Sequence, residues 1–390
     1  MKILLACGYF DWFSGYQETG LAKSFSSIAD TYVVAGDRVN PIFSDSHLAD
    51  RDHPRNYSVG TSREHGVTVK RVGVTEKRSM LFSSNYREAV ESVDPDLVIQ
   101  VMPGQILPAL ATKAAPDTPH LVLYGDNSAM WSNLTDLQRK IKWHVFSQTK
   151  GRLYSWVNAP ATKLFGYTPE TVDRLSPFSA GTDMEVLPLA YRRDHFYFDE
   201  TLRSDTRAKL GIQDHEIAVL VAGKIQPQKR IDIVAAAVSR AISTGSSVKF
   251  IVAGGTSSPD AAKVLEPVFE LPQMRSSIIQ TGFLSQQGLN EVFNAADVGV
   301  WPTMPAITIQ QAMGTGLPVV IPDNTIVGHL LKTGTGWFID SGSSIEDQVL
   351  DILRGLPDLS IDRPDYAKRN QWLSSDLVAR ELARYARLTP

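Results

Sequence analysis

Two lysines lie five positions apart in one short segment that could hold a phosphate group. Lys224 and Lys229 follow the apolar run Ala218–Ala222, which is typical of a buried strand. Two ammonium groups held close together repel each other unless an anion bridges them or water screens them. A diphosphate is such an anion, so the segment is a candidate diphosphate site. The alternative is an exposed basic turn without a ligand.

A second candidate site for a phosphate lies in Trp301–Asp323, which follows another apolar run. This segment predicts a short helix that begins near Thr308, its expected N-cap, and ends at Gly314 or Gly316. The next buried strand is expected at Leu317–Ile321. A helix N-terminus presents free amides and the positive end of a dipole, so it suits a phosphate. The alternative is an ordinary strand–helix–strand unit that binds no ligand.

A glycine-bearing loop separates the first predicted strand, Ile3–Ala6, from a predicted helix, Leu21–Ala29. A strand, a loop and a helix in this order are typical of the start of a doubly wound α/β domain. Gly15 and Gly20 would let backbone amides of this loop approach a substrate. The alternative is a surface loop whose aromatic side chains pack on the domain. The glycines lack the G-x-G-x-x-G spacing of a dinucleotide-binding loop.

Asp126 lies just beyond another predicted strand, His120–Tyr124. α/β folds place working residues at the carboxyl ends of their strands, so Asp126 is a candidate catalytic residue together with Lys224 and Lys229. The alternative is that Asp126 caps a helix.

Residues 136–156 combine basic and aromatic side chains, and most of them are expected to be helical. The side chains concerned are Arg139, Lys140, Lys142, Lys150, Arg152, Trp143, Phe146, Tyr154 and Trp156. A basic amphipathic helix of this kind can lie on a membrane surface, although a solvated basic face on a scaffold helix is the more frequent case. Peripheral membrane contact through 136–156 is therefore kept as a hypothesis. The next strand is expected at Ser155–Ala159.

The composition limits the class of protein. The chain has 390 residues, enough for two domains, and its 43% hydrophobic and 21% charged residues are typical of globular proteins. With a net charge of -3, the chain lacks the overall excess of positive charge that is typical of general nucleic-acid binding. The single cysteine, Cys7, excludes an internal disulfide framework and suits a reducing compartment. No apolar run is long enough to span a bilayer, so we expect a cytoplasmic protein that is at most peripheral to the membrane.

The motifs of the second half of the chain resemble those of a known family. GKIQPQKRIDIVAAAV, residues 223–238, is similar to the glycine-basic-(four residues)-lysine signature of GT4-type glycosyltransferases, which have the GT-B fold. The resemblance continues through VAGG, TGF, NAADVGVWPT and QAMGTGLPVVIPD, and it covers most of the second predicted domain. The first domain matches only in the order of its strands and helices and in its glycine loop.

The resemblance implies an α/β architecture of two Rossmann-like doubly wound domains that face each other across a cleft. The acceptor-side domain would be 1–187, the nucleotide-sugar domain 188–365, and 366–390 would carry a helix back to the first domain. The implied activity is that of a hexosyltransferase, which moves a sugar from a nucleotide diphosphate-sugar to an acceptor with retention of configuration. Such enzymes usually need no metal and no cofactor beyond the donor. The acceptor stays open among glycans, lipid-linked sugars, proteins, nucleic acids and small molecules.

The donor-binding residues implied by the resemblance are Gly15, Gly20, Gly223, Lys224, Lys229, Gly282, Phe283, Ile307, Thr308 and Gln311. The two lysines would hold the diphosphate, Gly282 and Phe283 would lie beside the nucleobase, and the first amides of the helix near Thr308 would contact a phosphate.

The sequence departs from the family at two places. The family has two glutamates that flank seven residues; the second falls on Gln311, the first falls on Thr303, and the loop between them is shortened. Glutamine can still bond ribose hydroxyls, but the carboxylate that grips the sugar has no evident counterpart. The family's histidine after the strand that resembles His120–Tyr124 is missing, and Gly125-Asp126 stands there instead. Two alternatives therefore stay open: a catalytically silent partner subunit or binding protein, and a GT-B sugar-nucleotide epimerase.

Overall fold

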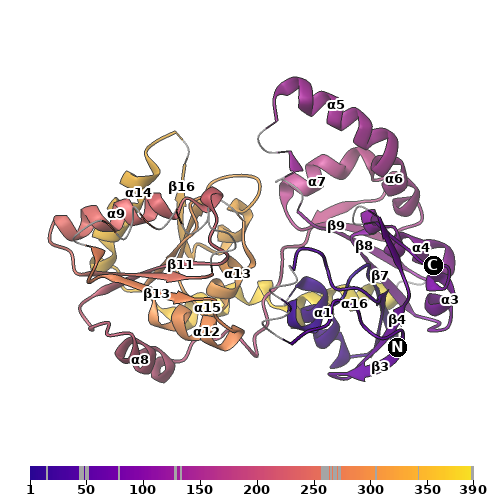
Figure 1. Ribbon diagram of the computed structural model, residues 1–390, viewed down its shortest axis with the longest axis horizontal. Coiled ribbons are helices and arrows are strands. Elements are labelled where there is room, and N and C mark those ends of the chain that lie inside the picture. The colour runs from indigo at the N-terminus through magenta and orange to yellow at the C-terminus, as the bar shows by residue number, and fades with distance from the viewer. Residues whose placement is uncertain are drawn as a thin grey trace. The chain divides into compact units, whose positions relative to one another are not determined.

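The computed structural model divides the chain into two compact units (Figure 1). Unit 1 consists of Met1–Pro188 and Ser375–Pro390, and unit 2 of Leu189–Ser374. The structure describes residues 1–390 except 15, 44–47, 49–51, 78–79, 127–129, 132–133, 256–262, 264–265, 267–269, 271–273, 304, 341 and 388–390.

Unit 1 is built on an eight-stranded sheet in the order β10-β9-β8-β7-β1-β2-β4-β3. Its strands are β1 (Lys2–Ala6), β2 (Asp30–Gly36), β3 (Gly60–Glu64), β4 (Val67–Val72), β7 (Leu97–Val101), β8 (His120–Tyr124), β9 (Lys163–Gly166) and β10 (Met184–Val186). Neighbouring strands run parallel, except that β3 is antiparallel to β4. A separate hairpin joins β5 (Thr75–Lys77) to β6 (Met80–Phe82). The central strand β1 is completely buried from Ile3 to Ala6, as its apolar sequence predicts.

The helices of unit 1 cover this sheet. They are α1 (Gln17–Ser26), α3 (Tyr86–Glu91), α4 (Leu107–Ala114), α5 (Asp136–Phe146), α6 (Arg152–Asn158), α7 (Pro169–Leu175) and α16 (Ser375–Ala383), with a π-helical turn at Ser147–Gly151. The C-terminal helix α16 packs beside α1, where the hydroxyl of Ser24 donates to that of Ser375 at 2.9 Å.

Two predictions in unit 1 are wrong. Helix α1 begins at Gln17, so Gly20 lies buried inside a helix and not in a loop. Ser155–Ala159 is not a strand, because α6 continues through Asn158 and buries Tyr154, Val157 and Asn158 at helical spacing. The next strand is β9, Lys163–Gly166.

Unit 2 is built on a six-stranded parallel sheet in the order β13-β12-β11-β14-β15-β16. Its strands are β11 (Ile217–Ala222), β12 (Val248–Ala253), β13 (Ile278–Gly282), β14 (Val298–Val300), β15 (Val319–Pro322) and β16 (Gly336–Ile339). Its helices are α8 (Glu200–Lys209), α9 (Ile231–Ser243), α12 (Gln286–Ala295), α13 (Ile307–Gly314), α14 (Ile345–Gly355) and α15 (Arg363–Arg369). One apolar cluster joins α9 and α14 to the sheet, and a second joins α12 and α13 to it.

Short 3-10 helices occur in both units. They are η1 (Trp12–Ser14), η2 (Pro103–Gln105), η5 (Ser176–Phe178), η6 (Pro227–Lys229), η8 (Gly328–Thr333), η9 (Leu356–Asp358), η10 (Asn370–Leu373) and η11 (Arg384–Arg387). Over the described ranges, no helix combines the length and the apolar character that crossing a membrane requires.

The chain returns to unit 1 at Ser375, which is later than the expected residue 366. Arg363 holds α15 in unit 2, because its buried guanidinium donates to the carbonyl oxygens of Ala296 and Phe293, each at 2.9 Å. The amide of Asn370 likewise donates to the carbonyl of Met313 at 3.1 Å.

Candidate functional site

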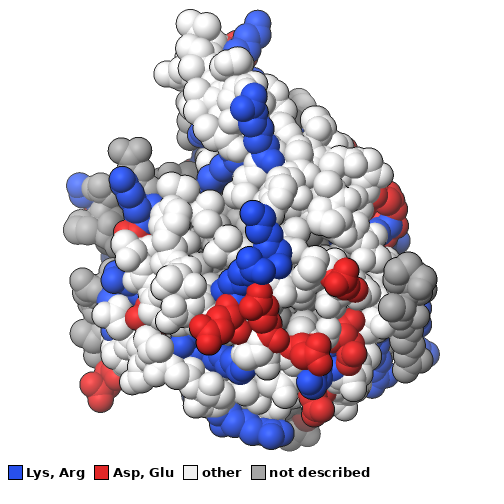
Figure 2. Space-filling view, turned by 90° about the vertical axis from the view of Figure 1, so that its right-hand side faces the viewer, with Lys and Arg blue, Asp and Glu red and all other residues white. Residues whose placement is uncertain are grey.

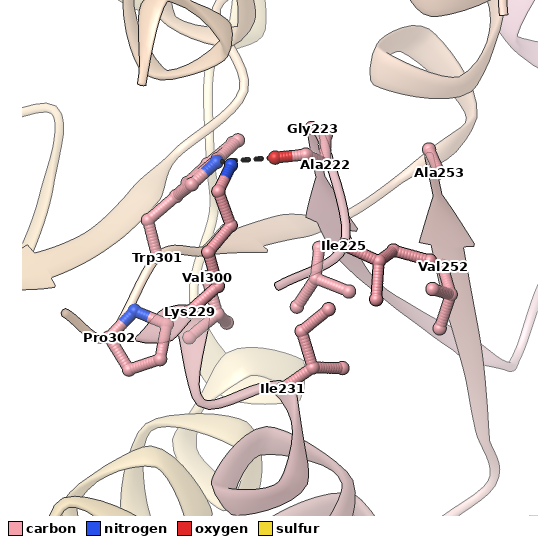
Figure 3. Close-up of a pocket in the computed structure, with 11 residues that line it drawn as sticks. Ala222, Gly223, Ile225, Lys229, Ile231, Val252, Ala253, Val300, Trp301 and Pro302 are labelled. Atoms are coloured by element: carbon pink, nitrogen blue, oxygen red, sulfur yellow. Dashed lines mark hydrogen bonds between the residues drawn. The ribbon is translucent and has the colours of Figure 1, made fainter. Parts of the chain in front are cut away.

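The candidate site lies where the strand order of unit 2 reverses. From β11 the chain moves outward to β12 and β13 on one side, and then returns to β14 on the other side. Ligands of doubly wound sheets bind outside the carboxyl ends of the strands at such a switch point. Here those ends are Ala222 of β11 and Val300 of β14. A pocket at this point is lined by Val221, Ala222, Gly223, Ile225, Lys229, Ile231, Val252, Ala253, Val300, Trp301 and Pro302 (Figure 3).

Lys229 supplies the positive charge of this mostly apolar pocket. It is half-buried at the end of η6, and its side chain runs back along the pocket toward Gly223 (Figure 3). Burial lowers the pKa of Lys229 to about 8, and no acidic side chain among the described residues counters this effect. An ammonium group in such surroundings is stabilised by an anion that binds beside it.

Two glycines allow the backbone to pass close to this lysine. Gly223 has φ +116°, a conformation that residues with a β-carbon rarely adopt. A β-carbon on Gly223 would stand 2.6 Å from Nζ of Lys229. A β-carbon on Gly254 would stand 2.1 Å from the carbonyl oxygen of Gly223. The site therefore requires the absence of side chains at both positions.

The N-terminus of α13 is fastened to the end of β11. The buried hydroxyl of Thr308 donates to the carbonyl of Ala222 at 3.1 Å. The indole Nε1 of Trp301 lies 3.0 Å from the same carbonyl and 3.1 Å from the Thr308 hydroxyl. The prediction that Thr308 caps this helix is wrong: the N-cap is Ala306, because the Thr308 hydroxyl bonds to a different strand. Ala306 has no side-chain acceptor, so no cap competes with a phosphate for the amides of Ile307 and Thr308.

Gln311 lies on the same short helix, one turn after Thr308. Its side chain is 7% exposed, and its carbonyl oxygen Oε1 is buried with no hydrogen-bond partner among the described residues. The neighbouring Gln310 has the same property. A buried acceptor without a partner is rare in proteins and calls for an explanation. A ribose hydroxyl that donates to Gln311 would be one.

The other residues expected to bind the donor lie at the surface of unit 2. Lys224 is exposed and is not among the residues that line the pocket with Lys229. Gly282 ends β13 with φ +68°, and Phe283 after it is 67% exposed. The β-carbon of Phe283 lies 3.5 Å from the point where a β-carbon on Gly255 would stand, so Phe283 lies beside the ends of β12 and β13. An exposed ring at this sheet edge is a surface on which a nucleobase can stack.

Of the expected site residues in unit 1, one is exposed, one is buried in a helix and one lies outside the described residues. Asp126 is exposed, two positions after the end of β8. Gly20 is buried in α1, so its backbone amide is part of a helix and does not line a substrate loop. Gly15 lies outside the described residues.

Trp301 is a member of the site that sequence reasoning missed. It follows the apolar run 296–300, and a large polar aromatic directly after a buried strand is a signal that could have drawn attention to it.

In the described part of the chain, no group of three or more His, Cys, Asp or Glu side chains is placed to hold a metal ion.

Comparison with known sequences identifies the segment that contains this site. Residues 216–355 match the family model described as glycosyl transferases group 1. The chain is also 26% identical, over 224 residues, to the D-inositol 3-phosphate glycosyltransferase of Rhodococcus erythropolis. That match covers 54% of this chain and 47% of the relative, so the chain spans about half the length of the protein that it matches.

Comparison with solved structures covers nearly the whole chain. The HepE protein of Anabaena, solved in complex with UDP, superposes with a TM-score of 0.70 at 15% identity, over 98% of this chain and 99% of the other. Sucrose-phosphate synthase of Thermosynechococcus elongatus superposes with a TM-score of 0.69 at 14% identity, over 99% and 98%. The expected fold class, GT-B with two doubly wound α/β units, is confirmed.

Proposed function

We propose that this chain, whose residues 216–355 match the family model of the glycosyl transferases group 1, moves a sugar from a nucleotide diphosphate-sugar to an acceptor. The observation that carries the proposal is the ammonium group of Lys229. It lies half-buried at the switch point of unit 2, without an acidic counter-charge among the described residues and next to the uncapped N-terminus of α13. A diphosphate would supply the missing negative charge and accept from the helix amides.

The proposed reaction exchanges two bonds at the anomeric carbon of the donor sugar. The bond from this carbon to the diphosphate oxygen breaks, and a bond to an acceptor hydroxyl oxygen forms. The proton of that hydroxyl leaves with the nucleoside diphosphate. Negative charge grows on the diphosphate in the transition state, and Lys229 and the α13 amides would stabilise it there. We propose retention of configuration and independence from metal ions, as the resemblance implies.

Gln311 and Phe283 complete the proposed donor site. The unpartnered carbonyl of Gln311 would accept from a ribose hydroxyl, and the exposed ring of Phe283 would lie beside the nucleobase. Lys224, on the same loop as Lys229, would contact the outer side of the diphosphate. Asp126 stays a candidate for the acceptor side.

The experiment that tests the proposal is donor turnover with a panel of UDP-, ADP- and GDP-sugars, in the presence and absence of EDTA. We expect release of the nucleoside diphosphate from at least one donor, undiminished by EDTA and lost in Lys229→Ala. Lys249→Ala, on β12 away from the pocket, is the matched control that should keep activity. Absence of any turnover would favour a silent binding subunit, and conversion of the donor into an isomer that keeps its nucleotide would favour an epimerase.

We also propose that the chain transfers the sugar in the cytoplasm and that residues 136–156 contact a membrane peripherally.

A further inference from the structure

Helix α5 of unit 1 has a well-anchored inner face. Trp143 and Phe146 stack with ring centroids 5.7 Å apart, and Trp131 contacts Trp143 edge-on at 5.6 Å. Phe146 is buried against Tyr154 and Phe178 in the apolar cluster beneath the helix. The orientation of α5 about its axis is therefore fixed by packing, and its outer face is defined.

The outer face of α5 carries a row of large apolar side chains. Leu137, Ile141 and Val145 follow one another at intervals of four residues, so they lie along one side of the helix. They are 68%, 58% and 55% exposed. Met130 before the helix and Trp156 in α6 are exposed as well, at 45% and 38%. Single exposed apolar residues are common on proteins, but a row of three on one helix indicates a contact surface. We call Leu137, Ile141 and Val145 the α5 stripe.

Basic side chains accompany the α5 stripe. Between 136 and 158 the chain has five Lys and Arg residues and one acid, Asp136. Asp136 is paired with Arg139 at 3.2 Å. Lys140, next to the stripe, and Arg152, in α6, are exposed and have no ion pair within the described ranges. Figure 2 shows Lys and Arg side chains running down from the uppermost part of this face, which α5 forms, through largely uncharged surface, with the acidic side chains gathered lower.

We propose that the α5 stripe and its basic neighbours dock unit 1 onto a bilayer that contains anionic lipid. An apolar row flanked by Lys and Arg is the pattern of helices that lie in the membrane interface, where the apolar side chains enter the acyl boundary and the cations meet lipid phosphates. A folded protein partner would need to supply both an apolar groove and acids, whereas an anionic membrane offers both along its whole surface. This inference specifies the membrane contact included in the proposed function, and it does not depend on sugar transfer.

Co-sedimentation with vesicles tests the inference without a donor or an acceptor. The full chain is mixed with vesicles of phosphatidylcholine alone, or of phosphatidylcholine with phosphatidylglycerol. We expect binding to the mixed vesicles only, and weaker binding as salt is raised. Leu137→Ser with Ile141→Ser should lower the partition coefficient by about tenfold or more, since each loses apolar area from the interface. Lys140→Gln should lower it by about fivefold.

The matched control removes two equally exposed apolar residues elsewhere in unit 1. Ile42 and Val59 are 63% and 61% exposed, so Ile42→Ser with Val59→Ser loses similar apolar surface outside the stripe. This variant should bind vesicles as the unchanged chain does. The proposal is overturned if the unchanged chain fails to bind anionic vesicles, if the stripe variant binds them equally well, or if the stripe variant abolishes self-association in sedimentation velocity, because the stripe would then be a protein interface. None of these results would bear on donor turnover.

Discussion

Nζ of Lys229 lies 2.6 Å from the position that a β-carbon on Gly223 would occupy. The lysine can therefore reach the end of β11 only because residue 223 has no side chain. The glycine also adopts φ +116°, which places its carbonyl beside Gly254. Among the described residues that line the pocket, Lys229 is the one cation, and its position depends on the backbone conformation of Gly223.

Gly223→Ala should weaken nucleotide binding as well as stability. Alanine at a positive φ should destabilise the protein by at least about 1 kcal/mol, and its methyl group should also displace the Lys229 ammonium. Gly245→Ala is the control, because Gly245 has φ +97° and open space around its β-carbon position. Thermal melts and UDP titration of both variants check this. Equal affinity in the two variants would show that Gly223 matters for backbone conformation alone.

The two lysines of the loop should contribute unequally. Lys229→Ala should weaken binding of the preferred nucleoside diphosphate by about 1.5–3 kcal/mol, the range for hydrogen bonds to charged groups. Lys224 is exposed, so Lys224→Ala should cost less than about 1 kcal/mol. Calorimetric titration with UDP, ADP and GDP measures both. A larger loss in the Lys224 variant would move the diphosphate from the pocket to the outer side of the loop.

Nucleotide affinity should fall with rising pH above about 8. At pH 7 Lys229 is mostly charged, and above its pKa of about 8 the free protein loses that charge. A bound diphosphate stabilises the ammonium, so binding then takes up a proton and the affinity should fall by up to about tenfold per pH unit. Calorimetry between pH 7 and 9.5, in buffers of different ionisation enthalpy, measures this proton uptake. The nucleotide affinity of Lys229→Met should not change with pH over this range. An affinity of the unchanged chain that is equally independent of pH would exclude Lys229 from the anion site.

Gln311 should behave as a ligand-binding residue and not as a packing residue. Gln311→Leu should cost about 1–3 kcal/mol in nucleotide affinity, because the ribose hydroxyls lose an acceptor. Its melting temperature should not fall, since the Oε1 atom has no partner to lose within the described residues. Gln311→Glu should be tolerated, because a carboxylate also accepts from hydroxyls. Unchanged affinity in the leucine variant would exclude Gln311 from the site.

The central strands of both units could be predicted from the sequence, because their residues are apolar without interruption. β8 begins and ends where its apolar run predicts, and β11 begins one residue before the run Ala218–Ala222 and ends with it. A parallel strand that is buried on both faces is apolar along its whole length, and the helices between such strands have apolar residues at helical spacing. The errors occurred where two short-range patterns overlap. Ser155–Ala159 is short and partly apolar, and only the burial of Tyr154 with Val157 distinguishes a helix there.

The site itself was only partly predictable, because its key contacts join residues far apart in the sequence. Threonine is a residue type that is favoured at N-caps. The hydroxyl of Thr308 nevertheless donates to the carbonyl of Ala222, 86 residues earlier. The position of Trp301 after a buried strand marks the residue, but its contact with the same carbonyl, 79 residues earlier, could not be read from that position. The difference between Lys224 and Lys229 also depends on which side chain folds back toward Gly223, and two lysines in one loop look alike in sequence.

The most direct test of the account is a crystal structure of the chain with a bound nucleoside diphosphate, chosen by the titration panel. We expect the phosphates to lie within hydrogen-bond distance of Nζ of Lys229 and of the first amides of α13, with a ribose hydroxyl at Oε1 of Gln311. A nucleotide bound elsewhere on unit 2, or phosphates that leave Lys229 without a contact, would contradict it.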